Sequence, residues 1–301
     1  MTGFNIDGYI SYWANKVNKF LGECISENSS VSKGLTTAMR YTLFAGGKRL
    51  RPALVYSSYA VFDSDFELVT PFASAVEVIH TYSLIHDDLP SMDNDDLRRG
   101  KPSNHKVFGE AVAILAGDGL LTRAFELMTD TGLNSNVDRS ILCEAVYKLS
   151  KAAGDSGMVA GQYMDMKGSE ECVCNPDKLV ERIHLYKTAA LIAYSTELGA
   201  IIAGSSEEDK YRMRRYGEKL GLAYQIADDV LDLEATADQI GKCVGKDKKM
   251  KKITYPSIKG IEESKKIAER LIEDALNIIN IYGDEALPLR EIARYMLSRG
   301  K

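Results

Sequence analysis

The chain contains 301 residues, of which 45% are hydrophobic and 27% charged, and its formal net charge is −5. This acidic balance argues against general nucleic-acid binding, and the five irregularly spaced cysteines do not form a disulfide framework. We find no signal peptide and no apolar run that would span a bilayer, so we expect no integral membrane association and a cytoplasmic location.

The hydrophobic pattern is helical nearly throughout, and no alternating strand pattern is convincing. No Pro/Ser-rich linker divides the chain, so we expect a single domain over residues 1–301. The sequence therefore predicts an all-α fold of about ten or more helices. In chain order we expect helices at residues 6–20, 35–43, 50–62, 72–88, 107–128, 141–153, 176–203, from 206 through the second aspartate cluster described below, 257–281 and 288–297.

Several of these boundaries rest on specific residues. The segment Ala45-Gly46-Gly47 provides a natural break, and Pro90 disfavours helical geometry in the preceding residue, so the central helix should end close to it. The Asn-Pro pair at 175–176 is a good N-cap and first turn. Ser206 with Asp209 approximates a capping box.

An aspartate cluster follows the central helix. Two of its carboxylates fall in the last helical turn, where they meet the negative end of the helix dipole and repel each other, so a cation should lie there. Carboxylate oxygens suit Mg2+, which usually takes one or two protein carboxylates and completes its shell with water and phosphate. The cluster consists of Asp87, Asp88, Asp93, Asp95 and Asp96.

A second cluster lies on another apolar helix, in the segment AYQIADDVLDLE. Asp228 and Asp232 are four residues apart and share one helix face with Gln225, while Asp229 adjoins Asp228. One such motif alone could equally be a solvated helix end. Two motifs, each on an apolar helix, favour a metal site.

Cations accompany both clusters. In GGKRLRP at residues 46–52, a helix start together with Lys48 and Arg51 forms a plausible phosphate site, whereas we expect Arg49 to face solvent. His80 lies seven residues before Asp87, on the same helix face. Taken alone it would be an ordinary core histidine, but beside these cations it could be a phosphate donor.

Other cationic side chains allow two interpretations. Arg98 and Arg99 could clamp phosphate or simply neutralise the nearby aspartates. Lys187 precedes Thr188 in the middle of an apolar helix, where a lysine needs an anion. In the lysine-rich segment 241–252, two residues nearest the aspartates could close over a bound anion: Lys242 and Lys246.

Taken together, the motifs resemble those of the trans-polyprenyl diphosphate synthases. The matching segments are DDLPSMD, NDDLRRG and DDVLD, joined in the family's order by GGKRLRP, GQYMD, KT at 187–188 and GKD at 245–247. The two residues inserted in the first motif are similar to those of bacterial farnesyl diphosphate synthases and plant-type geranylgeranyl synthases. The resemblance implies an isoprenoid synthase-type bundle around a central cavity, and a homodimer.

The resemblance also implies roles for individual residues. Mg2+, as about three ions with substrate bound and with Mn2+ as an alternative, would be held by the aspartates: chiefly Asp87, Asp93 and Asp228, supported by Asp88 and Asp232. Allylic diphosphate would be held by Arg98, Lys187, Gln225 and Lys242. Isopentenyl diphosphate would be held by Lys48, Arg51, His80 and Arg99. The developing cation would face Thr188, Gln225 and the carbonyl of Lys187.

The implied activity is Mg2+-dependent head-to-tail condensation of dimethylallyl and geranyl diphosphate with isopentenyl diphosphate, giving farnesyl diphosphate. Tyr82 lies five residues before Asp87, roughly 7.5 Å along the helix axis. Ser83 is closer to the Asp87 face, so helix geometry alone does not single out Tyr82. The resemblance implies that an aromatic residue at Tyr82 stops growth at farnesyl.

Three alternatives remain. A geranylgeranyl diphosphate synthase would use the same chemistry with a longer product. A non-catalytic subunit of a heteromeric prenyl synthase should have lost one aspartate motif, and both are intact here. A terpene cyclase should lack the second motif and the site formed by Lys48, Arg51 and His80.

Overall fold

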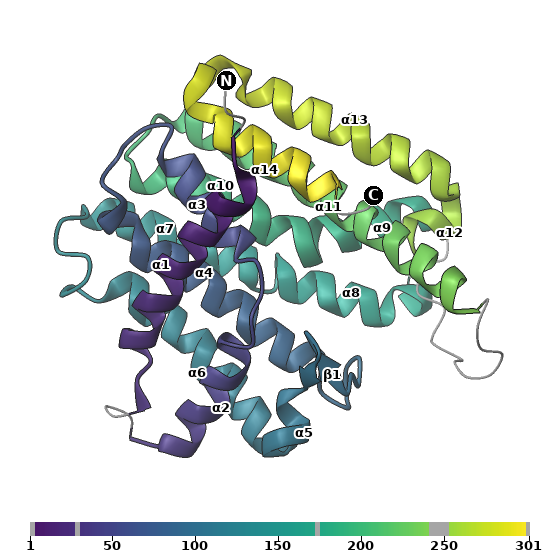
Figure 1. The fold of residues 1–301 in the computed structure, drawn as a ribbon, viewed down its shortest axis with the longest axis horizontal. Helices are drawn as coiled ribbons and strands as arrows, with labels where there is room; N and C mark the ends of the chain where they lie inside the picture. The colour runs from purple at the N-terminus through teal and green to yellow at the C-terminus, as the bar shows by residue number, and fades with distance from the viewer. Residues whose placement is uncertain (1–3, 28–30, 172–174, 241–252, 299–301) are drawn as a thin grey trace. The chain divides into compact units, whose positions relative to one another are not determined.

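The computed structural model describes residues 4–27, 31–171, 175–240 and 253–298. Over these residues the protein is helical apart from one short two-stranded hairpin, which confirms the all-α prediction (Figure 1). The chain forms two compact units, residues 1–146 with 201–204, and residues 147–200 with 205–301. Whether these units act as the single domain expected from the sequence stays a prediction.

The first unit is built around one long buried helix, α4. This helix packs against α1, α2, α3 and α6, and its residues from 69 to 79 are buried on every side. The hairpin β1–β2 pairs Leu97 with Pro102 just after the first aspartate cluster. The elements are α1 (Ile6–Cys24), α2 (Lys33–Leu43), α3 (Leu50–Tyr59), α4 (Phe66–Asp87), β1 (Leu97–Arg98), β2 (Lys101–Pro102), α5 (Asn104–Phe108), α6 (Glu110–Thr129) and the first half of α7 (Arg139–Ala153).

Aromatic and close-packed contacts hold α4 in place. Trp13 of α1 stacks on Tyr56 of α3 with ring centroids 4.0 Å apart, which fixes the α1–α3 side of the core. A Cβ on Gly117 of α6 would lie 2.0 Å from Nε2 of His86 on α4, so glycine at this position allows the two helices to pack closely without displacing that side chain. By length and hydropathy α4 is the one helix in the described ranges that could cross a bilayer, but 78% of its apolar window is buried inside the protein. It is a core helix.

The expected helix boundaries are confirmed at several positions and wrong at others. α4 ends at Asp87, shortly before Pro90, as predicted. The helix expected over 107–128 is instead split into α5 and α6 by Gly109, whose φ of 84° belongs to the left-handed region that glycine adopts readily. The helix expected over 257–281 is divided into two helices at Gly260, whose φ is 79°, and the second of them ends at Ile279.

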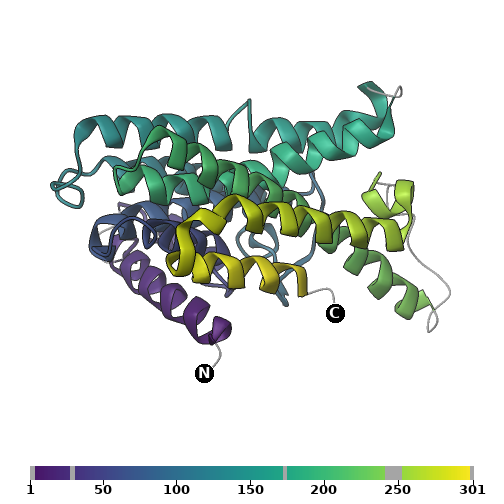
Figure 2. The ribbon, with the colours of Figure 1, turned by 90° about the horizontal axis from the view of Figure 1, so that it is seen from above.

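The second unit is organised around α11. This helix packs against α12, α13, α14 and the segment η2, and Tyr216 donates a buried hydrogen bond of 2.7 Å to the carbonyl of Leu289 on α14. Figure 1 and Figure 2 both show α14 alongside α13. The elements are the rest of α7, α8 (Met158–Glu171), α9 (Pro176–Ile183), η2 (His184–Ala189), α10 (Ala190–Ile202), α11 (Glu207–Ile240), α12 (Tyr255–Lys259), α13 (Ile261–Ile279), η3 (Asn280–Ala286) and α14 (Leu287–Ser298).

Both predicted caps in this unit are confirmed. The side chain of Asn175 accepts a hydrogen bond from the backbone of Lys178 at 3.2 Å, and Oγ of Ser206 accepts one from the backbone of Asp209 at 3.2 Å. The helix expected over 176–203 is not uniform, however. Its central segment η2 is a π-helix between α9 and α10, and π turns inside α-helices occur frequently at functional sites.

Candidate active site

The first aspartate cluster is gathered at the C-terminal end of α4 by the chain folding back. The backbone N–H of Asp93 donates to the carbonyl of Asp87 at 2.9 Å, so the two residues that carry candidate magnesium ligands adjoin at one helix end. Both residues are partly buried. Their carboxylates suit Mg2+. Within the described ranges, however, no group of three or more His, Cys, Asp or Glu side chains is already arranged to hold a metal ion.

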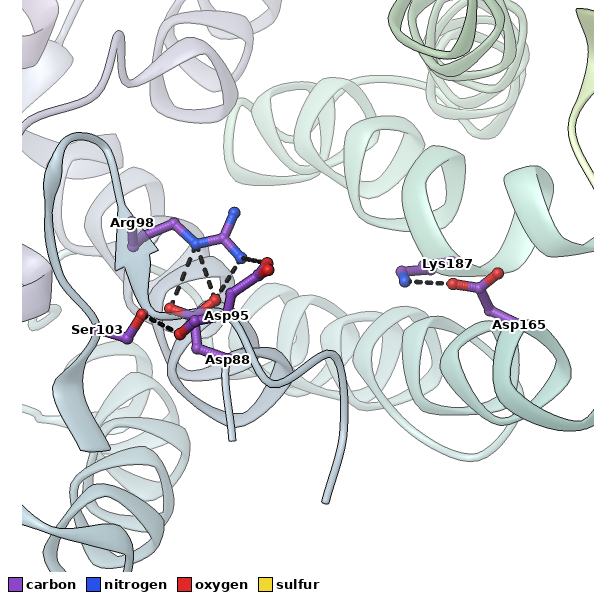
Figure 3. Close-up of polar contacts among 6 residues, drawn as sticks. All are labelled: Asp88, Asp95, Arg98, Ser103, Asp165 and Lys187. Atoms are coloured by element: carbon purple, nitrogen blue, oxygen red, sulfur yellow. Dashed lines mark hydrogen bonds and ion pairs between the residues drawn. The ribbon is translucent and has the colours of Figure 1, made fainter. Parts of the chain in front are cut away.

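Asp88 is placed differently from its neighbour Asp87. It is 1% exposed, and Nε of Arg98 donates to its two carboxylate oxygens at 2.9 and 3.3 Å (Figure 3). Arg98 also reaches Asp95 at 3.4 Å. Burial raises the pKa of Asp88, and Arg98 acts in the opposite direction. In this structure Arg98 neutralises aspartates, which is one of the two roles expected for it.

Four arginines of the same unit act electrostatically on His80. Burial is the main reason why the pKa of His80 lies well below its ordinary value, and the positive charges of Arg51, Arg99, Arg49 and Arg98 add to it, in that order. The pKa of Arg99 is lowered by burial too. The structure thus brings three predicted phosphate ligands, Arg51, His80 and Arg99, into one strongly cationic region, which suits a polyphosphate.

Arg99 reaches the glycine loop that precedes α3. Its guanidinium donates to the carbonyl of Gly46, and a Cβ on Gly47 would lie 2.5 Å from its Cζ. Glycine at this position therefore allows the arginine to lie flat against the loop. Lys48, the next residue, is exposed. The expected cations therefore come from the glycine loop, the first turn of α3 and the turn of the β1–β2 hairpin.

The expectation that Arg49 faces solvent is wrong. Its side chain is 1% exposed and forms an ion pair of 2.6 Å with the equally buried Glu77 of α4. Sequence pattern could not reveal this contact, because the two residues are 28 positions apart and a buried charge requires a partner that only the fold provides.

In the second unit, η2 presents two adjacent side chains to two different helices. Nζ of Lys187 lies 2.7 Å from Oδ2 of Asp165 on α8 (Figure 3), so the predicted need of this lysine for an anion is confirmed. Oγ1 of Thr188 donates 2.7 Å to Oε1 of Gln225 on α11. The predicted trio of Lys187, Thr188 and Gln225 is therefore assembled within one unit.

Asp229 is a structural centre that sequence reasoning did not single out. Its carboxylate accepts from Nε2 of Gln225 at 3.2 Å and from the backbone of Tyr255 at 3.3 Å, and it lies 3.2 Å from Nε2 of His184. The ring of His184 stacks on that of Tyr255. Its spacing of four from Gln225 was the available signal.

The two predicted metal ligands on this helix are oriented the other way. Asp228 and Asp232 are exposed, whereas Asp229 is buried. This pattern follows from the helical period, because residues four apart share a face and the intervening residue turns away. Lys242 and Lys246 lie outside the described residues.

The two candidate chain-length residues are both on α4. Tyr82 is 6% exposed and meets His86 edge-on, with ring centroids 5.8 Å apart. Burial, followed by the charge of Asp87, raises the pKa of Tyr82 to about 12. The hydroxyl of Ser83 instead donates 2.9 Å to the carbonyl of His80.

Comparison with known proteins agrees with this arrangement. Residues 32–281 match the polyprenyl synthetase family, and the chain belongs to that family. It is 44% identical over 301 residues to the large subunit 1 of a heterodimeric geranylgeranyl pyrophosphate synthase from Arabidopsis thaliana, covering 99% of this chain and 80% of the relative. It is also 44% identical over 265 residues to a farnesyl diphosphate synthase from Geobacillus stearothermophilus, covering 88% of each.

Solved structures show the same fold. An FPP/GFPP synthase from Zymomonas mobilis superposes with a TM-score of 0.87 at 36% identity, covering 97% of this chain and 99% of that one. A geranyltransferase from Legionella pneumophila gives 0.86 at 33% identity, covering 98% and 97%. The isoprenoid synthase-type fold expected from the motifs is confirmed, and the protein is a prenyltransferase by family. The relatives are named for both farnesyl and geranylgeranyl products.

Proposed function

We propose that the protein is a Mg2+-dependent farnesyl diphosphate synthase, which condenses dimethylallyl and then geranyl diphosphate with isopentenyl diphosphate. The observation that carries this proposal is that α4 bears both the aspartates at its C-terminal end and His80, whose protonation is opposed by the charges of four arginines. A metal-binding end and an anion-binding side on one helix suit a reaction between two diphosphates.

The arginine cluster would hold isopentenyl diphosphate. Because the pKa of His80 is depressed, its imidazole is neutral at pH 7 and donates one N–H to a phosphate oxygen. Arg51 and Arg99 supply charge-assisted hydrogen bonds to the same group, and Lys48 adds a further cation. Holding the double bond of this substrate in place replaces a chance encounter.

The allylic partner would be held by side chains of η2 and α11, and by two further cations that the motifs assign to it. Arg98, Lys187, Gln225 and Lys242 hold its diphosphate, while Thr188, Gln225 and the carbonyl of Lys187 face the allylic cation with their oxygen dipoles. The bond from Thr188 to Gln225 supports this role, because it fixes both polar groups before the charge develops. Water must be excluded, since it would trap the cation.

The aspartates fit the metal that the family's chemistry uses. Mg2+, as about three ions, would be held by Asp87, Asp93 and Asp228 with Asp88 and Asp232 in support. When bound, it supplies stabilisation of the negative charge that grows on the departing diphosphate. The released diphosphate is a suitable base for the final proton, so no separate catalytic histidine is needed.

Farnesyl is the proposed end product because Tyr82 is buried on α4 near Asp87. A geranylgeranyl product is the main alternative, since relatives of similar identity carry that name. We further propose one functional domain, a homodimer, and a cytoplasmic location. A non-catalytic subunit is disfavoured because both aspartate motifs are intact.

Product length tests the proposal directly. The purified protein would be incubated with isopentenyl diphosphate and, separately, dimethylallyl, geranyl or farnesyl diphosphate, with and without Mg2+, and the products separated by chromatography. We expect farnesyl diphosphate to accumulate and not to be extended. A geranylgeranyl product would refute the proposed length, and no Mg2+-dependent condensation would refute the enzyme.

A further inference from the structure

Arg49 is a buried arginine that the proposed mechanism does not use. It is the N-cap residue of α3, with φ 50° and ψ 42° in the left-handed region, where non-glycine residues are uncommon. Its Nη1 lies 2.6 Å from Oε1 of Glu77, and these two side chains are 1% and 2% exposed. A charge pair this deeply buried requires good geometry on all sides.

The other two nitrogens of the Arg49 guanidinium are also hydrogen-bonded. Its Nε donates to Oδ1 of Asn18 on α1 at 3.1 Å, and its Nη2 donates to the carbonyl of Leu43, the last residue of α2. One guanidinium therefore joins the end of α2, the middle of α1 and the side of α4. These contacts fix the loop 44–49 and the first turn of α3.

The fixed segment carries the proposed phosphate ligands. Lys48 directly precedes Arg49, and Arg51 lies two residues after it. On the other side of the ion pair, Glu77 lies three residues before His80, on the same face of α4. The Arg49–Glu77 pair thus connects the segment 48–51, which bears two of the ligands, to the helix that bears the third.

A buried ion pair is not needed here for stability alone, because well-packed apolar side chains of similar volume stabilise a core as well or better. What the arginine adds is a fixed geometry, because its planar guanidinium forms hydrogen bonds only with partners at particular positions. Glu77 also places a negative charge opposite Arg49, within a region that already contains Arg51 and Arg99.

We propose that Arg49, through its ion pair with Glu77, is a positioning residue for isopentenyl diphosphate, an inference that rests on the proposed function. It touches no substrate. It holds Lys48 and Arg51 at the spacing from His80 that a diphosphate requires.

The test is the variant Arg49→Lys, with Glu77→Gln as a second variant. Lysine keeps the positive charge and can still pair with Glu77, but it lacks the fork that reaches Asn18 and Leu43 at the same time. We expect the KM for isopentenyl diphosphate to rise about tenfold or more. The KM for geranyl diphosphate, and kcat at saturation with both substrates, should change by less than about twofold.

Arg123→Lys is the matched control. Arg123 lies on α6 of the same unit and also donates to a glutamate and to a backbone carbonyl, those of Glu126 and Cys24, but it is not among the charges that shift His80. Thermal unfolding of all variants separates a loss of stability from a loss of positioning. The control should leave the KM for isopentenyl diphosphate unchanged.

Direct titration of isopentenyl diphosphate by calorimetry separates this inference from the proposed function. If the wild type binds but does not condense, the proposed function fails, and the inference is still tested by the affinity of Arg49→Lys. An unchanged affinity or KM in Arg49→Lys would overturn the inference. The inference would also be overturned if Arg49→Lys raised the KM for isopentenyl and geranyl diphosphate equally, in proportion to its loss of stability. It would likewise be overturned if the wild type did not bind isopentenyl diphosphate.

Discussion

The ammonium group of Lys187 lies 2.7 Å from the carboxylate of Asp165, which ties the π segment η2 to α8. Both side chains are partly buried, with 24% and 15% exposed. If Lys187 holds the allylic diphosphate, Asp165 keeps it extended and charged between turnovers.

We therefore expect Lys187→Met to raise the KM for geranyl diphosphate about tenfold to a hundredfold, because a hydrogen bond to a charged group contributes roughly 1.5–3 kcal/mol. Asp165→Asn keeps a hydrogen-bond acceptor and should cost less. Steady-state kinetics with each substrate varied in turn measures both effects. A larger effect of Lys187→Met on isopentenyl diphosphate would contradict the assignment.

Removal of metal should abolish the reaction, and removal of one ligand should slow it. We expect Asp87→Asn to lower kcat about a hundredfold or more, because a bound metal contributes several kcal/mol to the transition state. Asp7→Asn, at an exposed aspartate of α1, is the control and should behave as wild type. Retained activity in EDTA would rule out the metal role.

The side chain of Tyr82 should set product length. Tyr82→Ala removes the ring, and we expect the product distribution to move from farnesyl towards geranylgeranyl and longer chains. Tyr82→Phe keeps the aromatic ring and should retain the farnesyl end point. Product chromatography distinguishes the two, and a Tyr82→Ala enzyme that still stops at farnesyl would show that another residue limits the product length.

The close contact of α4 with α6 predicts a stability effect. Gly117→Ala would place a Cβ 2.0 Å from the ring of His86, so we expect a loss of about 1–3 kcal/mol in the free energy of unfolding. In α1, nothing lies within 4 Å of a Cβ added to Gly22, and Gly22→Ala should stabilise by up to about 1 kcal/mol. Urea unfolding measures both changes, and equal effects would refute the packing argument.

The environment of His80 predicts a pH dependence. The pKa of His80 is lowered in the folded protein, chiefly by burial and then by Arg51, whereas an unfolded histidine titrates near ~6.5. Below that pH the unfolded chain binds the extra proton, so the free energy of unfolding falls as the pH drops. Compared with wild type, His80→Asn should reduce this slope by up to about 1.4 kcal/mol per pH unit. Denaturant unfolding between about pH 5 and 7 tests it, and identical slopes would contradict it.

Local signals in the sequence were sufficient for much of the fold. Pro90, Asn175 and Ser206 act within a few residues of themselves, so the helix ends they mark are where the sequence predicts them. The helical period likewise placed Asp228 and Asp232 together on an exposed face.

The features that sequence reasoning missed depend on distant partners. Arg49 is buried because it forms an ion pair with Glu77 of another helix, and the sequence pattern does not predict this contact. Asp229 looks like a third member of a metal motif until the fold brings His184 and Tyr255 to it. Gly109 divides a helix because its φ is positive, which an isolated glycine does not reveal.

The π segment η2 takes up more room than an α turn, and two glycines on its neighbours provide that room. A Cβ on Gly161 of α8 would lie 2.0 Å from the backbone nitrogen of Lys187, and one on Gly221 of α11 would lie 2.5 Å from Cα of Ala189. In an α-helix each residue turns the chain by about 100°. Deleting one residue from η2 would therefore rotate Lys187 away from Asp165 or Thr188 away from Gln225. Insertions and deletions in η2 should therefore be tolerated only together with changes at Gly161 and Gly221. In a redesign of the protein, η2 and these two glycines must be changed together.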